Sequence, residues 1–171
     1  MAGFKGSITV VLVHGAWADG SSWNDIIGPL LSKGLNVLAA PIPLTSLSDD
    51  AAALDRALEH THGPVVLVAH AYAGAVIAAN TSERVQWLVF IAALAPDEGE
   101  TVAEVFYRGK PHPQAPQLAP DVHGMIWMPR RDLQPLSLSM HPPNARHFLQ
   151  QHSGRSLSHA FMRELQGPLG K

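Results

Sequence analysis

The chain has 171 residues, 46% of them hydrophobic and 15% charged, a composition that indicates one folded domain and excludes a disordered chain. Its formal net charge of −2 provides no basic surface for nucleic acid or for an anionic membrane. Cysteine is absent, which excludes disulfides, thiolate nucleophiles and zinc–thiolate sites, whereas histidine occurs ten times.

The first predicted strand is the apolar run at 8–13, which is too short to span a membrane and leads into no cleavage pattern of small residues. We therefore expect a cytoplasmic protein. Three further apolar runs predict strands at 35–40, 65–69 and 85–91. Helices are predicted between the strands, with Ser21 or Ser22 capping the first and Ser48 capping the second. Strands that alternate with helices in this way predict an α/β domain, in which a parallel sheet lies between two helical layers.

The composition changes after Leu94, where no further strand is predicted. Nine of the fourteen prolines lie between Pro96 and Pro143. Within this stretch one short helix is predicted at 101–107. We expect one compact domain with three parts, which are a core at 1–95, a proline-rich, cap-like segment at 96–143 and a helical tail at 144–171.

Four motifs fall at the predicted strands and the loops that follow them, namely VLVHGAW, VLAAPIP, VLVAHAYAGAVI and LVFIAALAPDEGE. Together they resemble the α/β-hydrolase superfamily, and most closely its small bacterial members akin to plant esterases and hydroxynitrile lyases. The resemblance extends from Ile8 to Met128 and implies an α/β-hydrolase fold with a three-layer architecture. In that family two later strands deliver the catalytic acid and histidine. No candidate for these strands is visible, so we expect a C-terminally shortened fold with about four strands.

The family carries its nucleophilic serine at the apex of a G-x-S-x-G turn after the third strand. The resemblance places Ala71 at that apex and Ala69 and Ala73 at the two glycine positions. Alanine has no oxygen that can attack a carbonyl, so Ala71 marks a vacant nucleophile position. A strained turn without a hydroxyl leaves two alternatives: the surrounding packing forces the strain, or the turn has relaxed. The resemblance also implies that the backbone N–H groups of Ala16 and Tyr72 stabilise an oxyanion.

Two histidines, His14 and His70, follow the first and third strands, at the carboxyl ends where open α/β sheets bind ligands. Both are candidate catalytic residues, and both could instead orient loops through hydrogen bonds to the backbone. The family pattern favours loop orientation for His70, while the two interpretations are equal for His14. Trp17 and Tyr72 are expected to line the pocket, with Trp127 lining it from the cap. For Tyr72, packing alone is an equal alternative.

Most of the other histidines lie in the cap and tail, where zinc or another divalent ion would need ligands from distant segments. No HxH or HExxH motif on a suitable element supports such a site. His60 and His62 have a chelating spacing, but they follow a predicted helix, where its dipole explains them better. The candidate metal ligands are His112, His123, His141, His147, His152 and His159.

Three functional hypotheses follow. The first is a hydrolase of small ester-like substrates (carboxyl esters, lactones or phosphoesters) that has no serine nucleophile and activates water with a histidine-bound metal or a histidine base. The second is a non-catalytic small-ligand binder or an inactive fragment. The third is a serine esterase inactivated at Ala71. The first is preferred because the oxyanion loops and the cap are kept.

The fourth predicted strand, Val85–Ile91, would form the edge of the shortened sheet. An apolar edge strand with unpaired backbone groups is an aggregation hazard. We therefore expect a homodimer that covers this edge.

Overall fold

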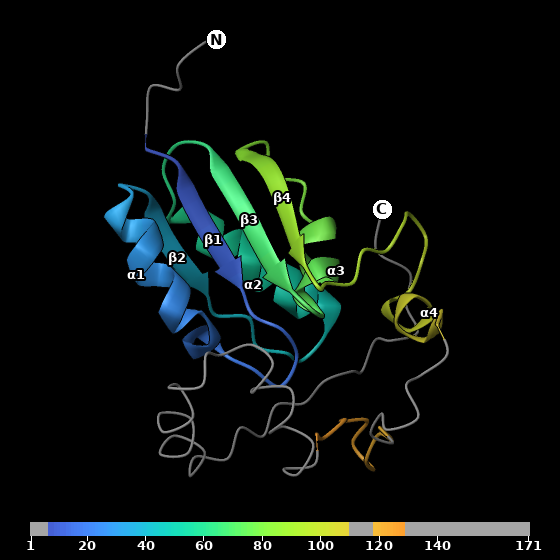
Figure 1. Ribbon diagram of the computed structural model, residues 1–171. Helices are drawn as coiled ribbons and strands as arrows, with labels where there is room; N and C mark the ends of the chain where they lie inside the picture. The colour runs from blue at the N-terminus through green and yellow to red at the C-terminus, as the bar shows by residue number, and fades with distance from the viewer. Residues whose placement is uncertain (1–6, 110–117, 129–171) are drawn as a thin grey trace.

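The computed structural model describes residues 7–109 and 118–128, so the predicted helical tail and much of the cap-like segment lie outside these ranges (Figure 1). The described strands form one parallel sheet in the order β2-β1-β3-β4. Each lies within one residue of its predicted bounds, and they are β1 (Thr9–Val13), β2 (Asn36–Ala40), β3 (Val65–His70) and β4 (Val85–Ile91). The predicted parallel α/β sheet is confirmed.

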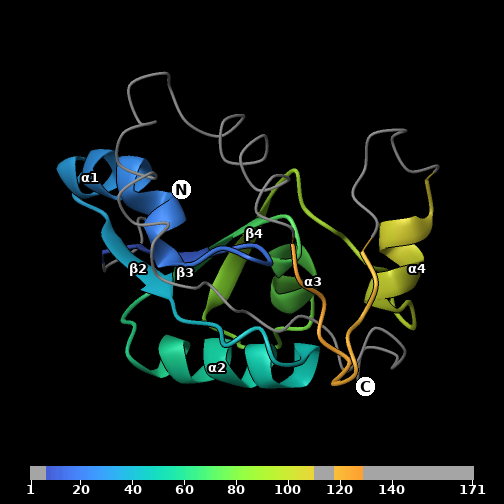
Figure 2. The same ribbon diagram turned by 90° about the horizontal axis from the view of Figure 1, so that it is seen from below.

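Helices cover both faces of this sheet, as Figure 2 shows. One face carries the 3-10 helix η1 (Gly20–Trp23) and α1 (Asn24–Ser32), and the other carries α2 (Leu47–Glu59) and α3 (Ala73–Ala78). Side chains of a strand alternate between the two faces. In β1, Val11 and Val13 therefore join the core on the α2 and α3 side, while Leu12 packs with Trp23 on the other side. Two cores on one sheet make the three predicted layers. None of the helices within the described ranges combines the length and the apolar character needed to cross a membrane.

The first two helices are capped by residues other than those predicted. Asp19 caps η1 in place of Ser21 or Ser22, because its carboxylate accepts a hydrogen bond from the Ser21 N–H at 2.8 Å. Ser46 caps α2 in place of Ser48, with its hydroxyl accepting from the backbone N–H three residues on at 3.0 Å. Both predictions were wrong. Ser48 falls inside α2, which begins earlier, whereas Ser21 and Ser22 fall inside η1 and the predicted helix, α1, begins after Trp23 without a side-chain cap.

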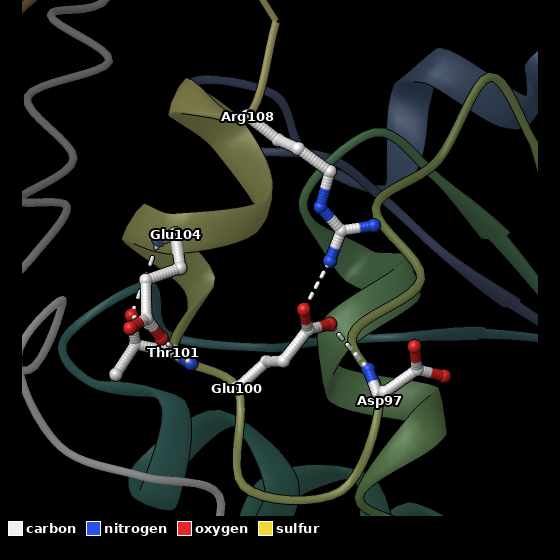
Figure 3. Close-up of polar contacts among 5 residues, drawn as sticks. All are labelled: Asp97, Glu100, Thr101, Glu104 and Arg108. Atoms are coloured by element: carbon white, nitrogen blue, oxygen red, sulfur yellow. Dashed lines mark hydrogen bonds and ion pairs between the residues drawn. The ribbon is translucent and has the colours of Figure 1, made fainter.

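After β4 the chain forms a short helix, α4 (Val102–Tyr107), which confirms the helix predicted at 101–107. Its first turn is closed by a capping box (Figure 3). The Thr101 hydroxyl accepts from the Glu104 N–H at 3.1 Å, and the Glu104 carboxylate accepts from the Thr101 N–H at 2.7 Å. Glu100 and Arg108 form an ion pair that spans the helix (Figure 3). These contacts stabilise a helix that is too short to persist on propensity alone.

Candidate functional site

Ala71 stands at the apex of the turn between β3 and α3 with a left-handed backbone, φ +52°. This conformation costs an L-residue about 1–2 kcal/mol, so the neighbouring structure must hold it. Three backbone hydrogen bonds do so. The Ala71 carbonyl accepts from the N–H of Leu94 at 2.9 Å and of Gly74 at 3.2 Å, and the Ala71 N–H donates to the Ile91 carbonyl at 3.4 Å. The turn has kept its strain, and the alternative of a relaxed turn is wrong.

Two glycines allow neighbouring segments to approach this turn closely. A Cβ atom added to Gly15 would lie 3.1 Å from the Cβ of Ala71 and 3.2 Å from Nδ1 of His70. A Cβ atom added to Gly74 would lie only 2.0 Å from the carbonyl oxygen of Leu94. The loops after β1 and β4 therefore meet the β3 turn at the carboxyl ends of the strands, where the arrowheads point in Figure 1.

The two candidate histidines have different surroundings. His14 is buried, and its Nδ1 lies 3.0 Å from the Gly15 carbonyl oxygen. Because a carbonyl oxygen can only accept, this nitrogen carries the ring proton. His70 is partly exposed, and burial lowers the pKa of its imidazole, which is therefore neutral at pH 7. The contact of His14 fits loop orientation, one of the two interpretations that the sequence left equal. The role of His70, for which the family pattern favours loop orientation, stays a prediction.

The two predicted oxyanion donors flank the apex. Ala16 follows the His14-Gly15 pair and packs partly buried against the larger core, and no acceptor in the described part of the chain takes its N–H. Tyr72 directly follows Ala71 and is the N-cap residue of α3. These positions agree with the roles that the resemblance implies, which stay predictions.

The side chain of Tyr72 belongs to the core. It is only 5% exposed, and its hydroxyl donates to the Asp50 carboxylate at 2.7 Å. Asp50 is fully buried and also accepts from the Leu44 N–H at 2.6 Å. This geometry fits the packing alternative for Tyr72. Sequence reasoning missed Asp50 because an acidic residue in a first helical turn already has a local explanation. The available signal was its spacing of four from Leu54, which aligns it with the apolar stripe of α2.

Of the two predicted pocket-lining tryptophans, Trp17 contacts the segment at 118–128 and Trp127 is part of it. Trp17 has φ +58°, and its indole N–H donates to the Ile126 carbonyl at 3.0 Å. This bond places residues near Ile126 over the loop that follows β1. Trp127 is about half exposed, and its indole N–H donates to the Asp121 carboxylate at 2.8 Å. Trp17 thus connects the core to the segment above it, and the pocket-lining role of both residues stays a prediction.

Of the six candidate metal ligands, only His123 lies within the described ranges. Its side chain is exposed, and its backbone N–H donates to the Asp121 carboxylate at 2.8 Å. Among residues 7–109 and 118–128, no three histidine, aspartate or glutamate side chains gather in a way that could hold a metal ion. The remaining predicted ligands lie outside these ranges and are His112, His141, His147, His152 and His159.

A family model described as the alpha/beta hydrolase family matches residues 10–168. The chain belongs to the α/β-hydrolase family. Among solved structures it is similar to a pyrethroid hydrolase from Sphingobium faniae, with 17% identity and a TM-score of 0.69 over 95% of this chain and 72% of that one. It is also similar to an extracellular α/β-hydrolase from a Paenibacillus species, with 23% identity and a TM-score of 0.52 over 57% of this chain and 45% of the other.

A third similar structure is polyneuridine aldehyde esterase, with 21% identity and a TM-score of 0.54 over 60% of this chain and 47% of that one. A search of curated proteins found no match. The aligned part of the chain spans about half the length of the Paenibacillus hydrolase and of the esterase. Identities this low establish the shared fold, and substrates do not transfer with them.

Replacing Ala71 by glycine should raise the free energy of unfolding by about 0.5–1 kcal/mol. Glycine adopts a positive φ without steric cost, and the larger conformational entropy that it loses on folding offsets part of this gain. Urea unfolding of the variant and the parent measures the difference. Ala73→Gly is the matched control. Ala73 is the first residue of α3, has no positive φ and is fully buried, so glycine should destabilise by about 1 kcal/mol through chain entropy and the lost methyl group. A loss of stability at both positions would contradict a strained backbone at Ala71.

Proposed function

We propose that the chain hydrolyses small ester-like substrates (carboxyl esters, lactones or phosphoesters) without a serine nucleophile. The observation that supports this most directly is the left-handed turn at Ala71, which three backbone hydrogen bonds maintain although the residue brings no hydroxyl. Such a turn is costly at alanine, and its persistence preserves the shape of a substrate-binding loop. A water molecule then takes the place of the serine oxygen as the attacking group.

In this mechanism His70 is the general base. It removes a proton from water as the water oxygen bonds to the carbonyl carbon or phosphorus, and negative charge moves to the former double-bonded oxygen. The backbone N–H groups of Ala16 and Tyr72 stabilise that charge. When the intermediate collapses, the bond to the leaving oxygen breaks and that oxygen receives the proton from His70. One ester and one water thus yield an acid and an alcohol.

A second form of the proposal uses a divalent ion, such as zinc, to activate the water. Its candidate ligands are the histidines of the cap and tail, and His123 is the one that lies within the described ranges. The alternative function is a small-ligand binder without catalysis, which the Ala71 methyl group favours because it cannot attack a substrate. A serine esterase inactivated at this same position is the remaining alternative.

The test measures turnover of an aryl acetate, a γ-lactone and a phosphotriester by the purified chain, with and without EDTA, alongside elemental analysis. We expect turnover that survives the chelator and falls at least about 100-fold in His70→Gln. His60→Gln is the matched control, because His60 is an exposed residue that ends α2 and leads toward the opposite end of the sheet. Since burial lowers the pKa of His70, the rate should stay constant near neutral pH and decline only below about pH 6.5.

Each other outcome selects a different function. Activity that EDTA removes and zinc restores would assign the water to a metal ion rather than to His70. If none of the three substrates is turned over, the proposal fails and the result favours the small-ligand binder without catalysis. If Ala71→Ser alone creates activity, the chain is an inactivated serine esterase that retains its other catalytic groups.

A further inference from the structure

Strand β4 ends the described sheet and exposes apolar side chains on both of its faces. Within the described residues it pairs with β3 alone (Figure 1). Five consecutive large side chains are each 40% to 44% exposed, and they are Trp87, Leu88, Val89, Phe90 and Ile91. Successive side chains of a strand point to opposite faces, so equal exposure means that neither face of β4 is well covered. In β3, by contrast, every second side chain is buried.

The chemistry of this edge suits a second copy of itself. No charged residue occurs from Val85 to Pro96, although Arg84 precedes this stretch and Asp97 follows it. Exposed edges are ordinarily protected by charge, by proline or by being very short, and the seven residues of β4 have none of these. Because the strand is uncharged, two copies of it meet without electrostatic repulsion.

We propose that β4 pairs with β4 of a second copy of this chain across a two-fold axis, which joins the two sheets into one. A two-fold axis makes a strand meet itself in the antiparallel direction. If the axis passes through Leu88, the middle residue of the strand, each of the seven residues lies opposite a residue of the other copy. Trp87 then lies opposite Val89 of the other copy, and Val85 lies opposite Ile91. Aromatic and β-branched residues form favourable cross-strand pairs of this kind.

The exposed area sets the expected strength of this dimer. The five side chains offer roughly 400 Å² of apolar surface per copy, the size of the largest patch on a typical monomer. A stable interface of standard size buries about 800 Å² per partner. Pairing at the edge covers only the parts of these side chains that face the other strand and leaves both faces of the joined sheet open. The strand side chains therefore supply less than half of that area, and most of the contact comes from backbone hydrogen bonds. We expect a dimer that dissociates on dilution.

Because the chain has no cysteine, a single introduced cysteine reports this contact without background. In Leu88→Cys the two thiols face each other across the axis, where antiparallel partners have Cα atoms about 4.5–5.5 Å apart, within the range of a disulfide. Ile91→Cys is the matched control, since Ile91 is equally exposed on the same strand. In the proposed register its two thiols would be about 20 Å apart. We expect a covalent dimer under mild oxidation for Leu88→Cys and little for Ile91→Cys.

Light scattering of the parent chain across a dilution series should give the mass of two chains at tens of micromolar and of one chain at lower concentration. Leu88→Lys should give one chain throughout, because two like charges would meet at the axis. If this variant fails to fold, the two cysteine variants still decide the matter. A parent chain that is monomeric at every concentration overturns the proposal. So does equal cross-linking of both cysteine variants, which indicates unspecific association, or cross-linking through Ile91 alone, which indicates another register.

Discussion

Replacing Gly74 by alanine should destabilise the fold by about 3 kcal/mol, from overpacking together with a lost hydrogen bond. In an ordinary helix this change is favourable by about 1 kcal/mol. Here the new Cβ would lie 2.0 Å from the Leu94 carbonyl oxygen and 2.9 Å from the Cβ of Ala93. The nearest of these atoms is backbone, so α3 or the loop after β4 must move. Either movement weakens the hydrogen bond from the Leu94 N–H to the Ala71 carbonyl, which holds the strained turn.

The matched control is Gly28→Ala in α1, where an added Cβ meets no atom within 4 Å. The better helix propensity of alanine and the restriction imposed by Pro29 oppose each other there, so the free energy of unfolding should change by less than about 1 kcal/mol. Chemical denaturation compares the two variants, and amide exchange of Leu94 reports the loop directly. If both substitutions change the free energy of unfolding equally, the close approach at Gly74 does not affect stability.

The sheet could be predicted from the sequence because its signal is local. Each strand is a run of apolar residues ended by a histidine, a proline or a loop, and the runs alternate with helical stripes. The position of the Ala71 turn followed from the resemblance. The backbone strain at that residue could not be predicted, because it is enforced by Ile91 at the end of β4 and by Leu94 in the following loop, some twenty residues later in the sequence. Only the assembled sheet brings that loop to the turn.

The network behind the turn was missed for a related reason. Asp49 and Asp50 are adjacent in the first turn of α2, and the helix dipole explains both. Which of them faces the core is set by the apolar stripe of the helix, and the spacing of four from Leu54 selects Asp50. The explanation at the helix N-terminus covered both residues, so this spacing was not used. In the structure Asp49 is exposed and accepts from the Thr45 hydroxyl at 2.8 Å, while Asp50 is fully buried. A sufficient local explanation at the helix N-terminus was enough to conceal the buried carboxylate.

Replacing Asp50 by alanine should destabilise the fold by about 3 kcal/mol, because the Leu44 N–H and the Tyr72 hydroxyl would each lose a buried acceptor. Asp50→Asn keeps the size of the side chain and one acceptor oxygen, so its loss should be smaller. Tyr72→Phe removes one of the donors and leaves the carboxylate in place. Urea unfolding of these three variants and of the double variant of Asp50→Ala with Tyr72→Phe isolates the coupling between the two side chains. A coupling of zero would contradict the hydrogen bond.

The pH dependence of the same variants identifies the charge state of this carboxyl. Burial raises the pKa of Asp50 above its usual value of 3.8 and outweighs the opposing hydrogen bonds from Tyr72 and Leu44. Between the unfolded pKa and this raised folded pKa, the folded chain binds more protons than the unfolded chain. The contribution of Asp50 to the free energy of unfolding must therefore fall as pH rises through that window. Asparagine does not titrate, so the stability of the parent minus that of Asp50→Asn should decrease from about pH 4 toward neutral pH. If this difference grows with pH instead, the pKa of the folded carboxyl is lowered. Asp50 is then an anion that the hydrogen bond from the Tyr72 hydroxyl stabilises.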